Sequence, residues 1–366
     1  TGLNTGGAEM SLLKLFSTSD NSKVNLLVVS LKDRGSIGEQ MEKQGVKVVE
    51  LNLSRFTPIT FNCFKLLFNL LSFKPDIIQG WMYHANFLSY LYSYAIPKAS
   101  IYWGIRQSLY STKNEKIITR IIIYLCKLVS FRCDKIIYNS KKSLEQHTNY
   151  GFTKNNCEVI PNGFNEKLFS PSIANRSNEN IRLELNIPED VIVIGVVARN
   201  HPMKGYENFI KAASHILQTY PNVQFIAAGN KIEKPRFKHL LNNMNIDSFH
   251  FLSEGRDISR LISIFDIAVS SSIWGEGFSN FICEAMLMEV PCVVTDVGDS
   301  KIIVKDLGIV VEPGNVSSLS RGIVKMIEMP LEKRKEIGRK SRTRIIENFS
   351  FEILKENYEK LYGIRS

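Results

Sequence analysis

The sequence has few of the residues that would indicate a metal site, a disulfide framework or a membrane span. Its six cysteines are scattered and none forms a C-x-x-C pair, so we expect reduced, mostly buried thiols. The six histidines form no metal-binding cluster, and no D-x-D motif occurs. No run of 18 apolar residues is available to span a bilayer, and no signal peptide is recognisable. These absences favour a cytoplasmic protein.

Acidic residues are in the minority, and the imbalance is confined to one half of the chain. The net charge is +10; residues 1–170 carry 21 Lys and Arg against 12 Asp and Glu, whereas the remainder carries 25 against 24. A basic half predicts a polyanionic surface as partner. The sequence has no aromatic–basic RNA motif and no zinc finger, so nucleic acid is not expected, and an anionic membrane surface is the better candidate. The alternative is a protein in which surface lysines are simply common.

Apolar strands alternate with amphipathic helices along the chain, which predicts an α/β fold with parallel sheets. The length of 366 residues favours two domains. A polar, turn-rich stretch at 168–180 is typical of a linker, which places the domains at 1–170 and 171–350, with a last helix at 351–366. The chain opens on a Gly-rich loop with no strand before it, so we expect that the first strand is missing. The predicted strands are 25–30, 46–51, 77–80, 99–105, 135–139, 159–161, 191–197, 224–229, 250–251, 267–270, 291–295 and 308–311.

The most informative segment is 271–286, where Glu276 and Glu284 lie eight positions apart. A Gly-containing turn joins an apolar strand to a helix that begins near Asn280. Such a turn directs backbone N–H groups and the positive end of the helix dipole at one place, which suits a phosphate. Glu284 lies one turn inside the helix on the same face as Asn280, roughly 6 Å from that place, where a carboxylate can accept from ribose hydroxyls.

Two other interpretations of this segment stay open at this point. The pattern Gly275-x-Gly277-x-x-Asn280 resembles a dinucleotide fingerprint, but the third glycine is absent and the turn follows a late strand instead of the first. A glutamate on an amphipathic helix is also commonly a solvated surface residue.

A second turn carries two cations, Arg199 and Lys204, after the first strand of the second half. Arg offers a planar fork to phosphate oxygens and Lys offers a point charge, so the pair predicts an anion clamp. A solvated loop is the alternative.

Taken in order over about 300 residues, these motifs resemble the retaining GT-B glycosyltransferases of family 4, also called glycosyl transferases group 1. The segments that carry the resemblance are Gly6-Gly7-Ala8-Glu9, 160–165 with Phe169 and Pro171, Arg199, Lys204-Gly205, Gly229, 255–258, Asp266, 276–278, 284–286 and 291–298. The resemblance implies two Rossmann-like domains facing across a cleft, with the C-terminal helix crossing back to the N-terminal, acceptor-side domain.

The resemblance also implies roles for single residues. Glu276 would contact the hydroxyls of the donor sugar, Glu284 the ribose diol, and Arg199 with Lys204 the diphosphate. The residues expected to bind the donor are Gly6, Gly7, Gly255, Asp257, Gly277, Phe278, Ser279, Asn280 and Glu284. The nucleotide sugar is then a substrate, and no cofactor or metal is expected.

The sequence departs from the family pattern in the first domain. Many members carry a histidine there after a strand, whereas this chain has Trp103-Gly104-Ile105-Arg106-Gln107-Ser108. Arg106 would stand in its place as a charge partner of the phosphate or the acceptor. His84, at another strand end, would line the acceptor pocket; the alternative for His84 is a helix cap or a core residue.

Two apolar and basic helices, at 65–74 and 116–127, would either rest on a membrane or pack on the sheet. If they touch a membrane, a polyprenyl-linked saccharide is the natural acceptor. We therefore expect a retaining transferase, catalytic through Glu276, Arg199, Lys204, Arg106 and His84, that moves a sugar, most simply from a UDP donor, to a glycan or lipid-linked acceptor of a bacterial surface polysaccharide. It would work in the cytoplasm or at the inner face of the plasma membrane.

Three alternatives to this expectation stay open. They are a GT-B sugar-nucleotide epimerase, a non-catalytic nucleotide-sugar-binding partner of another transferase, and an NAD oxidoreductase, the last disfavoured by the missing third glycine.

Overall fold

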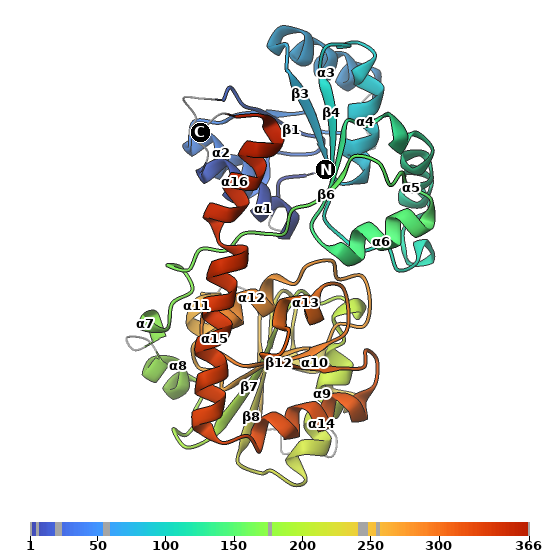
Figure 1. Cartoon of the computed structure of the whole chain (residues 1–366). Helices are drawn as coiled ribbons and strands as arrows, with labels where there is room; N and C mark the ends of the chain where they lie inside the picture. Colours follow the sequence, from blue (N-terminus) through green and yellow to red (C-terminus); the bar gives the residue numbers. More distant parts are fainter. Residues whose placement is uncertain are drawn as a thin grey trace. The chain divides into compact units, whose positions relative to one another are not determined.

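A computed structural model describes residues 2–4, 7–18, 24–53, 59–174, 178–240, 248–253 and 257–364. The chain forms two compact α/β units, which we describe separately (Figure 1). Unit 1 comprises Thr1–Gly163 together with Phe351–Ser366, and unit 2 comprises Phe164–Ser350. None of the helices in these ranges combines the length and the apolarity needed to traverse a bilayer.

Unit 2 is built on one parallel sheet with the strand order β12-β11-β10-β7-β8-β9. The chain enters at β7 in the middle, moves outward to β8 and β9, and then returns to β10 on the other side of β7. The direction of strand addition therefore reverses between β7 and β10, which is where open α/β sheets bind ligands. The strands are β7 (Ile192–Val197), β8 (Val223–Ala228), β9 (Phe249–Leu252), β10 (Ile267–Ser270), β11 (Cys292–Thr295) and β12 (Gly308–Val311).

The two faces of this sheet carry two separate hydrophobic clusters, because successive strand residues point to opposite sides. Ala268 belongs to one cluster, whereas its neighbours Ile267 and Val269 belong to the other. All residues of β10 and β11 are buried, as expected for central parallel strands covered on both faces. The helical segments of unit 2 are α7 (Pro171–Ala174), α8 (Asn178–Glu184), η3 (Pro202–Lys204), α9 (Tyr206–Leu217), α10 (Lys234–Phe237), η4 (Lys238–Leu240), α11 (Ile258–Ile262), α12 (Asn280–Leu287), α13 (Ser300–Val304), α14 (Val316–Ile327) and α15 (Leu331–Phe349).

Unit 1 has a four-stranded parallel sheet of order β3-β4-β5-β6 and a separate parallel pair, β1 and β2. Its strands are β1 (Leu27–Ser30), β2 (Lys47–Glu50), β3 (Ile77–Trp81), β4 (Ser100–Ile105), β5 (Lys135–Tyr138) and β6 (Cys157–Val159). Its helical segments are α1 (Gly7–Thr18), α2 (Gly35–Lys43), α3 (Ile59–Phe73), α4 (Tyr83–Ser93), η1 (Thr112–Asn114), α5 (Ile117–Val129), η2 (Ser130–Arg132), α6 (Lys141–Tyr150) and α16 (Phe351–Tyr362).

The last helix, α16, packs on unit 1 although it follows unit 2 in the sequence. Its buried residues Leu354, Tyr358 and Leu361 join Trp81 and Ile137 in one cluster. The chain passes between the units at Gly163–Phe164 and Ser350–Phe351.

The linker predicted at 168–180 lies inside unit 2, because aromatic side chains on either side of position 168 belong to its core. Phe164 is buried in the large cluster of that unit, and Phe169 packs against it. The strands predicted at 267–270 and 308–311 are confirmed to the residue, whereas β6 begins two residues before its predicted start.

Candidate functional site

Three loops meet at the carboxyl edge of the unit 2 sheet, where the strand order reverses. They follow β7, β10 and β11, which are adjacent in the sheet. The Ile273 N–H donates to the Met203 carbonyl at 2.7 Å, and the Asp299 N–H donates to the Gly277 carbonyl at 2.9 Å. The loops are therefore fastened to one another through their backbones.

An ion pair between Lys204 and Glu276 lies at the centre of this junction. The Lys204 ammonium, on the β7 loop, donates to Glu276 Oε2, on the β10 loop. The Ser272 hydroxyl donates to the same oxygen at 3.1 Å, and the Ser271 hydroxyl donates to the Lys204 carbonyl at 2.9 Å. The side chains of Lys204 and Glu276 are only 16% and 10% exposed, so the pair is largely withdrawn from water.

The electrostatic surroundings keep Glu276 ionised. Burial by itself raises the pKa of this carboxyl, but the Lys204 charge and hydrogen bond, the Ser272 hydroxyl and the Arg199 charge outweigh it. The pKa of Glu276 therefore lies below its ordinary value, and the site holds a carboxylate at neutral pH.

Two glycines allow the loops to approach this closely. Gly205 has φ +65°, and a Cβ there would lie 2.1 Å from the Ser271 carbonyl oxygen. Gly298, with φ +61°, would place a Cβ 2.4 Å from the carbonyl oxygens of both Glu276 and Gly277. Only glycine satisfies both the left-handed backbone and the lack of space.

Helix α12 begins beside Glu276 and carries the remaining residues expected on this loop. Ser279 is its N-cap and is buried, but its hydroxyl makes no capping hydrogen bond. Phe278 is turned into the core, with its ring centroid 6.2 Å from Phe164 and 5.2 Å from Phe349. Asn280 and Glu284 are half-buried and share the face expected from their spacing.

The other residues predicted to bind the donor lie outside the Lys204–Glu276 ion pair. Arg199 is exposed, and its guanidinium approaches the Met203 sulfur at 3.6 Å. Asp257 caps α11: its carboxylate accepts from the Ser259 N–H at 2.9 Å and from the Ser259 hydroxyl at 2.7 Å. Gly7 begins α1 in unit 1, whereas Gly6 and Gly255 lie outside the described residues.

Arg106 lies after β4 in unit 1 and is engaged with the last helix. Its guanidinium donates to the Tyr358 hydroxyl at 2.5 Å and to the Ile160 carbonyl at 3.3 Å. The guanidinium carbon lies 4.3 Å from the Trp81 ring centroid. These contacts place Arg106 in the packing of α16; its expected contact with the phosphate or the acceptor stays a prediction.

His84 is the second residue of α4 and is half-buried. Burial, together with the nearby Lys32 ammonium, lowers the pKa of its imidazole. A neutral imidazole at this position is consistent with either of the roles considered for it.

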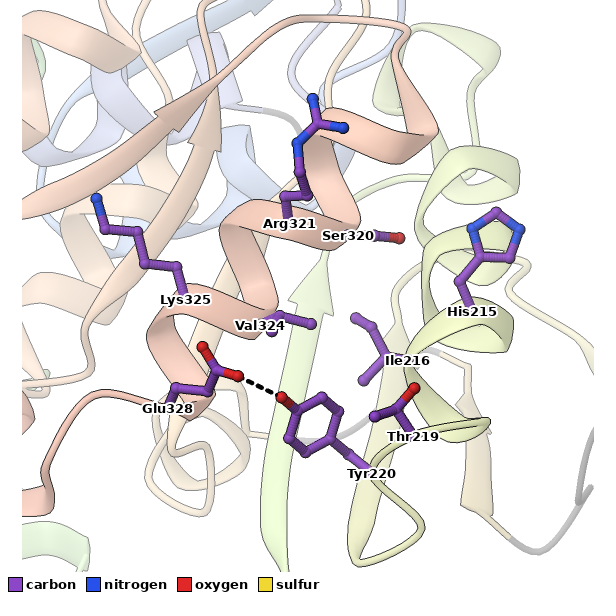
Figure 2. Close-up of a pocket in the computed structure, with 9 residues that line it drawn as sticks. All are labelled: His215, Ile216, Thr219, Tyr220, Ser320, Arg321, Val324, Lys325 and Glu328. Atoms are coloured by element: carbon purple, nitrogen blue, oxygen red, sulfur yellow. Dashed lines mark hydrogen bonds between the residues drawn. The ribbon is translucent and has the colours of Figure 1, made fainter.

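A separate hollow of about 370 Å³ lies between α9 and α14 in unit 2, and Figure 2 shows its lining. The Tyr220 hydroxyl donates to Glu328 at 2.5 Å across it. Because α9 runs back from the carboxyl edge of the sheet, its last turn lies at the opposite edge from Lys204. This hollow is therefore separate from the loop junction.

Several residues that complete these arrangements were not predicted. Ser272 bonds Glu276, Thr295 donates to the Ser272 carbonyl at 2.6 Å, and Tyr358 bonds Arg106. Ser272 lies four positions before Glu276, which was a usable signal; Tyr358 is 252 positions from Arg106 and offered none. Within the described ranges, no group of three His, Cys, Asp or Glu residues is placed to hold a metal.

Comparisons with known proteins match one family model to most of each unit. The family model "Glycosyltransferase Family 4" matches residues 5–168, and "Glycosyl transferases group 1" matches residues 177–344. An uncharacterized glycosyltransferase of Methanocaldococcus jannaschii is 24% identical over 319 residues, covering 82% of this chain and 75% of the relative. An Escherichia coli UDP-Gal:alpha-D-GlcNAc-diphosphoundecaprenol alpha-1,3-galactosyltransferase is 27% identical over 176 residues, 46% of this chain and 45% of the relative.

A solved structure has the same fold over nearly the whole chain. Anabaena HepE in complex with UDP superposes with a TM-score of 0.82 at 22% identity, covering 98% of this chain and 96% of that chain. The same protein is also known in complex with UDP-glucose.

Proposed function

Because the chain belongs to the group 1 glycosyltransferases of the GT-B fold, we propose that it is a retaining transferase that uses a UDP-sugar. The proposed acceptor is a saccharide or a lipid-linked saccharide of a surface polysaccharide.

The Lys204–Glu276 pair at the strand-order reversal carries this proposal. Cleavage of the sugar–phosphate bond leaves negative charge on a nucleoside diphosphate. A preplaced ammonium, a nearby guanidinium and the start of a helix stabilise that charge as it develops, without reorganisation during the reaction. Lys204, Arg199 and the first turn of α12 lie around one loop junction, which supports this proposal.

Glu276 has a second part in the proposal. Its lowered pKa keeps it an acceptor of hydrogen bonds, which suits the hydroxyls of a donor sugar beside the diphosphate. Glu284 lies one helical turn further on, where its carboxylate would accept from the ribose diol. The leaving phosphate would take the acceptor's proton. Lys204, Arg199 and the start of α12 would stabilise the diphosphate charge that a metal ion would otherwise neutralise, so the proposed reaction uses no metal or other cofactor.

The relatives support the choice of donor and acceptor. The name of the Escherichia coli relative specifies a UDP-sugar donor and a diphosphoundecaprenol-linked acceptor. HepE binds UDP and UDP-glucose. We therefore propose a uridine nucleotide for the donor and a polyprenyl diphosphate-linked saccharide for the acceptor.

A donor panel tests the proposal. Thermal unfolding and slow hydrolysis are measured with UDP-, GDP-, ADP- and CMP-sugars, without acceptor or metal. We expect a UDP-sugar to raise the unfolding temperature and to be hydrolysed with retained anomeric configuration. Interconversion of the sugar without hydrolysis would indicate an epimerase, binding without turnover even with acceptor glycans would indicate a non-catalytic partner, and binding of no donor would contradict the proposal.

The ribose assignment has its own variant. We expect Glu284→Ala to weaken UDP binding about tenfold, since it removes an acceptor for two hydroxyls. Glu332→Ala, which removes an exposed carboxylate on α15, is the matched control and should leave affinity unchanged. Equal affinities of the two variants would remove Glu284 from the ribose site.

A further inference from the structure

Helix α5 of unit 1 presents an apolar stripe to solvent. Ile117, Ile121, Tyr124 and Leu128 follow one another at helical spacing, and all are between 49% and 73% exposed. Ile118 and Phe131, at its two ends, are 68% and 65% exposed. A contiguous row of large apolar side chains on a surface marks a contact with another body.

The stripe is not a sign of a loosely packed helix, because the opposite face of α5 is fully engaged. Ile123 and Cys126 have no exposed surface and lie in one cluster with Tyr83 of α4. The Cys126 thiol also donates to the Tyr83 carbonyl at 3.5 Å. Helix α5 therefore has two apolar faces, one packed in the core of unit 1 and one exposed to solvent.

Cations border the free face. Lys116 and Arg120 are exposed beside the stripe, and the Lys127 ammonium lies 4.7 Å from the Tyr124 ring centroid. The Arg132 guanidinium lies 5.3 Å from the Phe131 ring centroid. Such long side chains cover apolar surface with their stems and hold their charges at its edge.

Acidic groups near the stripe are few and otherwise engaged. The segment Ile117–Val129 contains none. Glu115, just before it, accepts from Gln107 at 3.4 Å, and Asp134, just after it, accepts from the Ile101 N–H at 2.7 Å.

A neighbouring helix also exposes large apolar side chains. Helix α4 packs against α5 (Figure 1). It also packs against α3 through a further cluster, in which Leu66 and Leu70 of α3 are buried. The outward residues of α3 include Phe64 and Phe68, which are 70% and 73% exposed.

We propose that the outward face of α5 rests on an anionic phospholipid surface, with its apolar stripe in the headgroup–acyl boundary and its cations at the phosphates. An apolar face bordered by Lys and Arg is the composition that binds in the plane of such a surface. A second copy of this chain fits less well, because the segment Ile117–Val129 offers no acidic side chain to pair with the cations that border the stripe of the other copy. The purpose of this membrane contact rests on the lipid-linked acceptor of the proposed function, but the test of the contact does not depend on that acceptor.

The test is co-sedimentation of the full chain with vesicles in the absence of nucleotide sugar. We expect binding to vesicles of phosphatidylglycerol and phosphatidylcholine, and much weaker binding to phosphatidylcholine alone or at high salt. Ile117→Gln with Ile121→Gln should weaken binding about tenfold or more, since two large apolar side chains leave the membrane. The matched control, Leu183→Gln with Leu331→Gln, changes two exposed leucines of unit 2 and should bind as the unchanged protein does.

A charge variant keeps the test decisive if the first one unfolds. Lys116→Glu with Arg120→Glu alters exposed side chains only and should abolish binding to anionic vesicles, whereas Lys211→Glu with Lys333→Glu should not. Equal binding of both pairs, equal binding to neutral vesicles, or self-association that disappears in the α5 variants would overturn the proposal. Because no donor is present, these outcomes are independent of the donor panel: vesicle binding can fail while UDP-sugar turnover succeeds, and the reverse.

Discussion

Each unit of this protein holds a largely buried cation just after a central parallel strand, and the two cations are satisfied in different ways. Lys204, after β7, is paired with the ionised Glu276 on a neighbouring loop. Arg106, after β4, is held by neutral acceptors and by the face of Trp81. A carboxylate and an ammonium at a loop junction can exchange partners with an incoming diphosphate and sugar, whereas the bonds that the Arg106 guanidinium makes here hold the last helix to unit 1. A position after a central strand thus predicts a buried cation in both units, but the groups that the cation contacts differ between them.

The largest effect is expected when the Lys204 side of the comparison is broken. Lys204→Ala removes the cation that we propose faces the developing phosphate charge, so we expect transfer to fall about 10²–10³-fold. It also leaves Glu276 buried without its counterion, which should cost about 3 kcal/mol in the free energy of unfolding. Turnover with the donor identified in the panel and denaturant unfolding measure the two effects.

A second variant separates these two effects. Adding Glu276→Gln to Lys204→Ala removes the orphaned charge, so much of the lost stability should return while transfer stays low. Recovery of transfer in the double variant would show that Lys204 acts by folding the loops and not by binding the donor.

The fold of both units was largely predictable, because buried parallel strands are short apolar runs between polar turns. The residues Ile267–Ser270 and Gly308–Val311 are examples. The placement of Lys204 and Glu276 at one site was predictable, since both residues follow strands in segments that resemble one family. The contact between Arg106 and Tyr358 was not predictable, because the whole of unit 2 separates the two residues in the sequence. The sequence also could not show whether the second apolar face of α5 is exposed, since an apolar helix has the same sequence pattern whether that face is covered or not.

A buried histidine in unit 1 makes the stability of that unit depend on pH. His147 has no exposed surface; its Nδ1–H donates to the Ser143 carbonyl at 2.7 Å, and its Nε2 accepts from the Tyr83 hydroxyl at 2.7 Å. Burial lowers the pKa of His147 to about 4, although the Ser143 carbonyl acts in the other direction. The neutral ring is therefore part of the folded state.

The unfolded chain binds this proton at about pH 6.5, so it holds more protons than the folded chain between there and pH 4. Stability should be complete above that window and fall by about 3 kcal/mol as the pH drops through it. Unfolding of the protein and of His147→Gln at several pH values measures the difference. A difference between them that does not change with pH would contradict the assignment.

The Arg106 side of the comparison should respond in stability instead of nucleotide binding. Arg106→Met keeps an apolar stem but loses the bonds to Tyr358 and Ile160, which should lower the free energy of unfolding by about 2 kcal/mol. UDP affinity should be unchanged, because the proposed nucleotide site lies in unit 2. Arg106→Lys is the matched control, which keeps the charge but not the planar fork and should recover only part of the loss. A large loss of transfer in a variant of normal stability would instead support a direct contact with the acceptor or the phosphate.

The smallest expected effect concerns the close approach of the loops around Glu276. Gly298→Ala forces a Cβ to within 2.4 Å of the Glu276 and Gly277 carbonyls, whereas Gly314→Ala, at a similar positive φ of 75°, meets its nearest neighbour, Ile273, only at 3.7 Å. Both variants carry the backbone strain of about 1 kcal/mol, so a difference between them reports the crowding alone. We expect Gly298→Ala to be the less stable and to bind the donor more weakly, because the backbone that carries Glu276 must move. Equal stability and equal donor affinity in the two variants would show that the loop yields without displacing the carboxylate, and the tight junction would then be a feature of folding and not of the site.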